Sequence, residues 1–209
     1  MNTLGISGSP SSSSRSAWLV RYTLAQLDRA NARVVEVSSL PARALLSADS
    51  GHPELQDALH ALTRADFIII GTPIYKAAYS GLLKVFLDLL PADGLRGKTV
   101  LPLATGGSLA HLLALDYALK PVLSALGARD ILDSVFAVEA ELARDAQGVY
   151  LPSYELRERI TRVVTDATAR RPSTVPHVRD AAPLPEGSAL GNFFPQQGWL
   201  QARTGDVPA

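Results

Sequence analysis

The chain has 209 residues, no cysteine, four histidines and a formal net charge of zero, with 20 basic and 20 acidic residues. Its length suits one domain of roughly 150 to 180 residues with an appendage. The balanced charge offers no attraction to nucleic acid or to an anionic membrane, no apolar stretch approaches the ~18 residues of a membrane span, and the histidines show no metal-ligand spacing, so we expect a soluble cytoplasmic protein without a metal site.

Apolar segments of strand length alternate with helical patterns along the chain. In order, we expect strand 2–7, helix 15–30, strand 33–37, helix 53–64, strand 66–71, helix 80–90, strand 98–104, helix 109–126, strand 130–137 and helix 153–169. Because the strands are short and nearly all apolar, they suit a parallel sheet covered by helices on both faces. The sequence predicts an α/β, flavodoxin-like three-layer sandwich with strand order 2-1-3-4-5, and a Rossmann-type order is the alternative.

The predicted strand order determines where a ligand binds. In doubly wound sheets the binding crevice lies beyond the carboxyl ends of the strands, at the point where the strand order reverses. Here that point falls between the first and third strands. We therefore expect three loops, residues 8–14, 72–79 and 105–108, to converge on one ligand.

The first of these loops has the features of a phosphate-binding site. Its small residues let the backbone approach an anion, and the first N–H groups of the helix that follows have no partners inside the helix. Ser14 is the expected N-cap, Arg15 adds a positive charge, and Ser9 and Ser16 offer hydroxyl groups. An ordinary serine-rich turn between a strand and a helix is an equally good interpretation of this segment alone.

The other two loops suit a planar ring. Pro73 stiffens the backbone after a buried strand, and Ile74 and Tyr75 supply an apolar face. In Thr105-Gly106-Gly107-Ser108, the paired glycines let the backbone lie against a ligand, and their N–H groups suit the pyrimidine carbonyls of a flavin. For Tyr79 we favour a different role, packing against another helix at an interface.

Two better-known phosphate-binding motifs are excluded by their spacing. Residues 5–8 lack the G-x-G-x-x-G register of a dinucleotide site. Residues 94–99 end in Gly-Lys-Thr, but only two residues separate the glycines where a nucleotide-triphosphate loop has four, and a strand follows. We expect a simple turn there.

Pro121 lies inside the predicted helix 109–126 and has no N–H group. The carbonyl of Tyr117, four residues earlier, therefore loses its usual donor. We expect a helix defect centred on Tyr117, either a π-bulge in which the N–H of Val122 serves this carbonyl or a simple proline kink. This helix and the segment 82–90 are apolar on more than one face, so we also expect a homodimer or homotetramer built on them.

Three segments together resemble a known family: Ser7-Gly8-Ser9-Pro10, Thr72-Pro73-Ile74-Tyr75-Lys76-Ala77-Ala78-Tyr79-Ser80-Gly81 and Leu101-Pro102-Leu103-Ala104-Thr105-Gly106-Gly107-Ser108. With the helix up to Pro121, they resemble the NAD(P)H-dependent FMN reductases. The closest likeness is to the reductase component of two-component alkanesulfonate monooxygenases. The resemblance covers roughly residues 1–138.

The resemblance implies FMN bound at the three loops and hydride transfer to it from NADPH or NADH. Reduced FMN then passes to a flavin-dependent monooxygenase that desulfonates organosulfonates. The phosphate falls on Ser9, Ser14, Arg15 and Ser16, and the ring on Pro73, Ile74, Tyr75, Thr105, Gly106, Gly107 and Ser108. It also implies a tetramer with Tyr117, inserted in a π-helix, at a subunit interface.

This sequence departs from the family pattern at one position, and we expect no catalytic residue. The family often has arginine directly after Ser-Pro, where this chain has Ser11, which affects phosphate affinity and the choice between NADH and NADPH. No protein acid or base is expected in the reaction, because the nicotinamide donates its hydride directly to the flavin. His111, alone in an apolar helix, is expected to be a packed or interfacial residue.

Two other functions fit the same fold. One is a quinone, azo-dye or chromate reductase that retains its FMN, and the other is a flavodoxin-type electron carrier, which the neutral charge disfavours. The last segment, 172–209, contains six of the 14 prolines and no periodic pattern. We expect a domain over 1–171 and a tail over 172–209 that is flexible or that docks its Phe193, Phe194 and Trp199 onto a subunit.

Overall fold

The computed structural model describes residues 1–27 and 32–169. The predicted tail, 172–209, lies outside the described residues, so the domain boundary at residue 171 and the docking of the aromatic cluster stay predictions. In the described ranges, no helix combines the length and the apolar character needed to cross a membrane.

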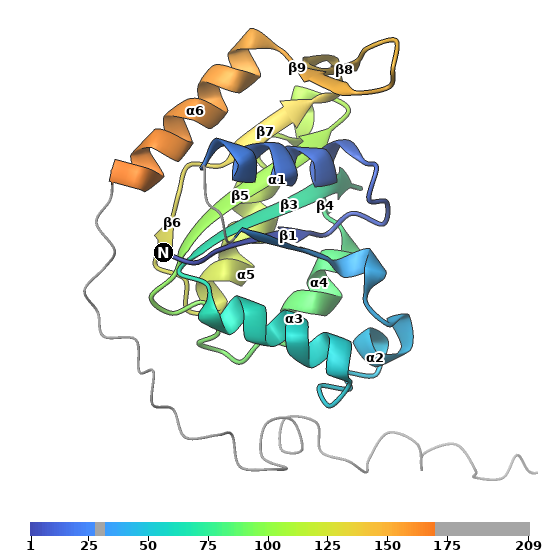
Figure 1. Cartoon of the computed structure of the whole chain (residues 1–209), viewed down its shortest axis with the longest axis vertical. Coiled ribbons are helices and arrows are strands. Elements are labelled where there is room, and N and C mark those ends of the chain that lie inside the picture. The colour runs from blue at the N-terminus through green and yellow to red at the C-terminus, as the bar shows by residue number, and fades with distance from the viewer. Residues whose placement is uncertain (28–31, 170–209) are drawn as a thin grey trace, which may run out of the picture. The chain divides into compact units, whose positions relative to one another are not determined.

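A central, mostly parallel sheet forms the middle layer (Figure 1). Strands β2 (Arg33–Glu36), β1 (Thr3–Ser7), β3 (Phe67–Tyr75), β5 (Thr99–Gly106) and β6 (Asp130–Ile131) lie side by side in this order, and β7 (Val135–Val138) also pairs with β5. The predicted flavodoxin-like order is confirmed and the Rossmann-type order is wrong. This arrangement places the ends of β1, β3 and β5 next to one another.

The structure corrects two details of the predicted sheet. The expected strand 130–137 is divided, because residues 132–134 leave the strand conformation between β6 and β7. Asp133, in this break, is of a residue type that is depleted in strands. In addition, the sheet is not purely parallel, since β4 (Ala78–Tyr79) folds back on the end of β3 as an antiparallel partner.

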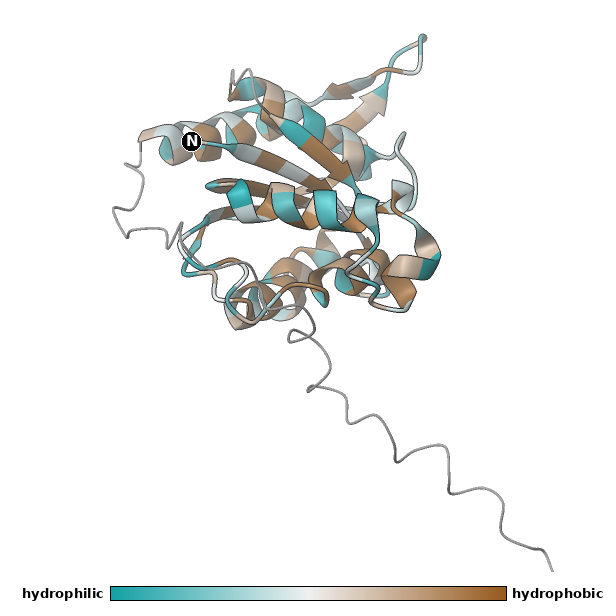
Figure 2. Ribbon diagram, turned by 60° about the horizontal axis from the view of Figure 1, so that its bottom comes forward, coloured by the Kyte–Doolittle hydropathy of each residue, from teal (hydrophilic) through white to brown (hydrophobic). Residues whose placement is uncertain are grey.

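Helices cover both faces of the sheet, as predicted (Figure 1). On one face, α1 (Arg15–Gln26) and α6 (Tyr154–Ala169) pack over Phe67 and Ile69. On the other, α2 (Ala42–Leu46), α3 (Pro53–Arg64), α4 (Gly81–Leu87) and α5 (Lys120–Ala125) pack over Ile68 and Ile70. Because successive side chains of a strand point to opposite faces, the apolar run in β3 supplies both cores, and Figure 2 shows apolar residues recurring along the central strands.

Several elements were not predicted. They are α2, the 3₁₀ segments η1 (Val37–Ser39), η2 (Leu109–His111) and η4 (Glu139–Glu141), and an antiparallel hairpin of β8 (Leu142–Arg144) and β9 (Tyr150–Pro152). The hairpin has a recognisable turn, because the Asp145 carboxylate accepts hydrogen bonds from the N–H groups of Gln147 and Val149, and Gly148 has a φ of 81°. Such a turn signal predicts a hairpin only where strands are expected on both sides of it.

The predicted helix 109–126 is interrupted where the sequence indicated. Instead of one helix there are η2, the π-helix η3 (Leu115–Leu119) and α5. The N–H of Lys120 donates to the carbonyl of Leu115, five residues back, as in a π-helix. The predicted π-helical defect around Tyr117 is confirmed and the simple kink is wrong. The expected bond from the Val122 N–H to the Tyr117 carbonyl stays a prediction.

Candidate functional site

The three loops at the ends of β1, β3 and β5 line one cleft of about 370 Å³. This volume is within the range of small-molecule sites, about 300–1,000 Å³. The structure brings most of the predicted site residues to its wall: Ser14, Arg15, Ser16, Pro73, Ile74, Tyr75, Thr105, Gly106 and Gly107. The predicted meeting of three separate loops is therefore present in the fold.

Two predicted site residues do not line the cleft. Ser9 is buried beneath the first loop, where its Oγ accepts a hydrogen bond of 3.2 Å from the N–H of Ser11. It shapes the loop from below. Ser108 is exposed and lies one residue beyond the part of the third loop that lines the wall.

The N-terminus of α1 forms one end of the cleft. Ser14 is the N-cap, as predicted, because its Oγ accepts a 3.1 Å hydrogen bond from the N–H of Ala17. The N–H groups of Arg15 and Ser16 make no hydrogen bond to any residue in the described ranges. Free N–H groups and the helix dipole together favour an anion at this position.

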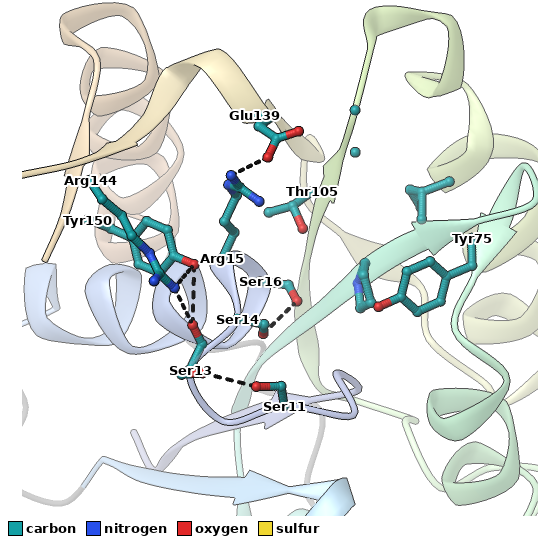
Figure 3. A pocket seen from close by; sticks show the side chains of 14 residues that line it. Ser11, Ser13, Ser14, Arg15, Ser16, Tyr75, Thr105, Glu139, Arg144 and Tyr150 are labelled. Atoms are coloured by element: carbon teal, nitrogen blue, oxygen red, sulfur yellow. Dashed lines mark hydrogen bonds and ion pairs between the residues drawn. The ribbon is translucent and has the colours of Figure 1, made fainter. Parts of the chain in front are cut away.

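Side chains hold two carbonyl groups of this loop in place, and Figure 3 shows those that bond to Ser13. The Arg21 guanidinium donates to the Ser12 carbonyl at 2.5 Å. The Ser13 carbonyl accepts from Arg144 at 3.3 Å and from the Tyr150 hydroxyl at 3.2 Å. With these carbonyls engaged, the hydroxyl and N–H groups of the loop remain available to a ligand.

Five residues that line the cleft were not predicted as site residues. Ser11 and Ser13 belong to the first loop, and Glu139, Arg144 and Tyr150 come from η4 and the β8–β9 hairpin. Glu139 forms an ion pair with Arg15. The Nε atom of Arg15 is buried and has no hydrogen-bond partner in the described structure. Two guanidinium groups against one carboxylate leave this end of the cleft electropositive.

The other end of the cleft is apolar and has exposed backbone. Tyr75 lies on the side opposite Arg144 and Tyr150 (Figure 3), and 53% of its surface is exposed. It precedes a two-residue turn between β3 and β4 in which Lys76 and Ala77 have φ angles of 50° and 64°. Positive φ at both turn positions matches a type I′ hairpin, a conformation that is unfavourable for residues other than glycine, asparagine and aspartate.

Gly107 gives this end its open floor. A Cβ built on Gly107 meets nothing within 4 Å, so the backbone there faces open space. The preceding Gly106 is different, because its Cβ would lie 2.7 Å from Cζ of Phe136 beneath the loop. The pair thus lies between a packed core residue and the cleft, which suits the flat face of a heterocycle.

One buried serine joins the first two loops. The Ser80 hydroxyl donates to the Gly8 carbonyl at 2.5 Å and accepts from the N–H of Leu83 at 3.1 Å as the N-cap of α4. The Ser80 N–H donates to Oγ1 of the buried Thr72 at 3.0 Å. The relative position of the two loops therefore depends on Ser80.

The two tyrosines expected at an interface differ in exposure. Tyr79 is partly buried against the core of its own chain, next to the π-helix, and burial raises its pKa above the ordinary value. Tyr117 is 78% exposed. The exposed Leu109, Leu112 and Leu113 lie just before it in the sequence.

Comparison with known proteins places the cleft in a family context. Residues 1–142 match the sequence model of the family described as NADPH-dependent FMN reductase. An FMN reductase (NADPH) of Escherichia coli (strain K12) is 48% identical over 144 residues, which are 68% of this chain and 75% of that protein. The NADH-dependent FMN reductase SfnE of Pseudomonas putida is 36% identical over 149 residues, 68% of this chain and 80% of that protein. A crystal structure of the NADH:FMN oxidoreductase EMOB in its apo form superimposes with a TM-score of 0.71 at 42% identity, covering 79% of this chain and 87% of that one.

Proposed function

Because this chain belongs to the family of NADPH-dependent FMN reductases, we propose that its cleft binds FMN, with the phosphate at the N-terminus of α1 and the ring between Tyr75 and the Gly106-Gly107 loop. The protein is an NAD(P)H-dependent FMN reductase, an oxidoreductase that uses FMN with NADPH or NADH as electron donor. The observation that carries the proposed placement is the convergence of the three loops on one cleft with chemically different ends.

The electropositive end fits a phosphomonoester. It offers the hydroxyls of Ser14 and Ser16, the free N–H groups of the first turn of α1, and the guanidinium groups of Arg15 and Arg144. Charge-assisted hydrogen bonds from such donors are the strongest that a phosphate receives in proteins. The buried, unpartnered Nε of Arg15 also fits a ligand that brings an acceptor.

The apolar end fits the ring. Pro73, Ile74 and Tyr75 supply apolar surface, and the loop from Thr105 to Gly107 supplies backbone N–H and C=O groups. The chemistry that FMN supplies when bound is acceptance of a hydride from the nicotinamide. The residues of the chain align and bind the reactants, and none is assigned a proton-transfer role.

A titration with a kinetic assay tests this function. FMN added to the purified protein should saturate one site per chain, and oxidation of NADPH or NADH, followed by its absorbance, should rise with added FMN. A rate that is independent of free FMN but rises with a quinone acceptor supports the quinone-reductase alternative. Bound FMN without NADPH or NADH oxidation supports the electron carrier. Failure to bind FMN at all refutes the placement.

We also propose that reduced FMN leaves the cleft for a flavin-dependent monooxygenase that acts on organosulfonates. The sequence resemblance supports this partner, and the exposure of Tyr75 at the wall is consistent with a flavin that enters and leaves. A mixture of the reductase, NADPH, FMN and an alkanesulfonate monooxygenase should release sulfite. Sulfite release with chemically reduced FMN but not with the reductase contradicts the proposal.

The same family resemblance and the exposed apolar residues support a homodimer or homotetramer. Leu109, Leu112, Leu113 and Tyr117 form an apolar stretch with exposed fractions of 63%, 47%, 52% and 78%. Exposed apolar residues gathered on one segment are typical of interaction surfaces. Light scattering at micromolar concentration should give a multimeric mass for the full chain, and a strict monomer refutes the proposal.

A further inference from the structure

The β8–β9 hairpin lies almost entirely beyond the residues that match the family model, which end at 142, yet it contributes to the wall of the cleft. We propose that Arg144 on this hairpin binds a phosphomonoester group of the ligand, and that Tyr150 is the residue that positions it. This inference rests on the proposed function, because the phosphate group belongs to the flavin or the nicotinamide that the enzyme uses.

Arg144 is held in place while most of its donors remain available. Its Nη2 donates to the Tyr150 hydroxyl at 2.6 Å and to the Ser13 carbonyl at 3.3 Å. Its Nε and Nη1 make no hydrogen bond to any residue in the described ranges. A guanidinium carries five N–H donors in a rigid fork that matches the oxygens of a phosphate, so the unused donors of Arg144 suit such a ligand.

Tyr150 provides a rigid support for this guanidinium. The tyrosine is 8% exposed, and the Arg144 Cζ lies 4.4 Å from the centroid of its ring. On α1, Trp18 contacts the same ring at a centroid distance of 5.9 Å and stacks on Tyr22 at 4.7 Å. The Tyr150 hydroxyl also donates to the Ser13 carbonyl, so one side chain fixes both the guanidinium and the loop.

The charges around Tyr150 favour an added anion. The Arg15 Cζ lies 5.9 Å from the same ring centroid, so two guanidinium groups flank one tyrosine. Arg15 pairs with Glu139, whereas Arg144 pairs with no carboxylate of the described residues. A phosphomonoester, which carries up to two negative charges, relieves the repulsion between the two cations and interacts favourably with the dipole of α1.

Two groups share this chemistry, the 5′-phosphate of FMN and the 2′-phosphate of NADPH. Arg144 contacts the loop that leads into α1, where the flavin phosphate is proposed to bind, so we assign it to FMN. Riboflavin, which lacks the phosphate, and NADH, which lacks the 2′-phosphate, provide the matched probes that separate the two sources.

The test measures dissociation constants of FMN and riboflavin by quenching of flavin fluorescence, and KM values for NADPH and NADH. Arg144→Ala should raise the Kd of FMN about 10- to 100-fold and change that of riboflavin less than about 2-fold. Arg144→Lys should give an intermediate value, because it keeps the charge and loses the fork. Tyr150→Phe keeps the ring and removes the hydroxyl. It should raise the Kd of FMN by about 3- to 10-fold and leave the Kd of riboflavin unchanged.

Arg96→Ala is the matched control, because Arg96 is exposed, pairs with Asp93 and is not part of the cleft. It should change neither flavin's Kd. If Arg144→Ala raises the KM of NADPH and not of NADH, and leaves FMN binding unchanged, Arg144 recognises the 2′-phosphate of NADPH. This outcome overturns the assignment of Arg144 to the FMN phosphate. Equal weakening of FMN and riboflavin, or no change in any ligand, overturns the inference while leaving the proposed function in place. Failure of the wild-type protein to bind FMN overturns both.

Discussion

Replacing Gly71 with alanine should destabilise the fold by about 1–3 kcal/mol and weaken FMN binding as well. Gly71 lies in β3, directly under α1. A Cβ at this position would lie 2.2 Å from Cγ2 of Val20 and 3.2 Å from the backbone carbonyl of Ser16. Both contacts are with α1, so the helix must move away from the sheet. Because the proposed phosphate-binding site is the N-terminus of this helix, stability and ligand binding should fall together.

A double-mutant cycle identifies the cause. Val20→Ala removes the clashing Cγ2 and, because Val20 is fully buried, should by itself cost about 1–3 kcal/mol through the cavity it leaves. In the Gly71→Ala/Val20→Ala variant the new methyl occupies part of that cavity. The free energy of unfolding lost by the double variant should therefore be about 1–2 kcal/mol smaller than the sum of the losses of the two single variants. Urea unfolding of the four proteins provides the free energies.

Gly81→Ala is the control for Gly71→Ala. A Cβ on Gly81 meets nothing within 4 Å, and Gly81 is the first residue of α4. The same substitution there should be neutral or stabilising by up to about 1 kcal/mol, because alanine restricts the unfolded chain. Strict additivity of Gly71→Ala and Val20→Ala, or an equal loss from Gly81→Ala, contradicts the steric explanation.

The sequence was sufficient for those features that depend on local patterns. The apolar run of β3 fixes a strand with two buried faces, and the strand–helix alternation fixes the order of the sheet. The π-helix was predictable for the same reason, since its cause, the missing N–H of Pro121, lies within one turn of the defect. Once the strand order was known, the meeting of the three loops followed from topology alone.

Features that depend on contacts between distant segments were not predictable in this way. The strands of the β8–β9 hairpin have only three residues each, too few to show an alternating pattern. Its contribution to the site depends on contacts of Tyr150 and Arg144 with Ser13, more than 130 positions earlier. Ser9 also differs from its predicted role. Its hydroxyl was expected to face the ligand, but it is buried under the loop.

Replacing Ser80 with alanine should cost about 2–3 kcal/mol of stability, since it combines the loss of a helix cap with a buried acceptor left without its partner. The substitution removes the hydrogen bond to the Gly8 carbonyl and the cap on the N–H of Leu83. The two segments are closely packed here, because a Cβ on Gly8 would lie 2.5 Å from Cβ of Leu83. Ser47→Ala is the matched control, since its hydroxyl bonds to an exposed helical carbonyl, and it should cost less than about 0.5 kcal/mol.

Ser80→Ala should affect flavin binding in a different way from the substitution of a residue that contacts the phosphate. Ser80 does not line the cleft but fixes the loop after β1 relative to the loop after β3. Loosening that connection affects the phosphate end and the ring end together, so FMN and riboflavin should both bind more weakly, by similar factors. Fluorescence titrations of Ser80→Ala with FMN and riboflavin test this expectation. If only FMN binding is weakened, or if the loss of stability is no larger than that of Ser47→Ala, Ser80 does not hold the two loops together.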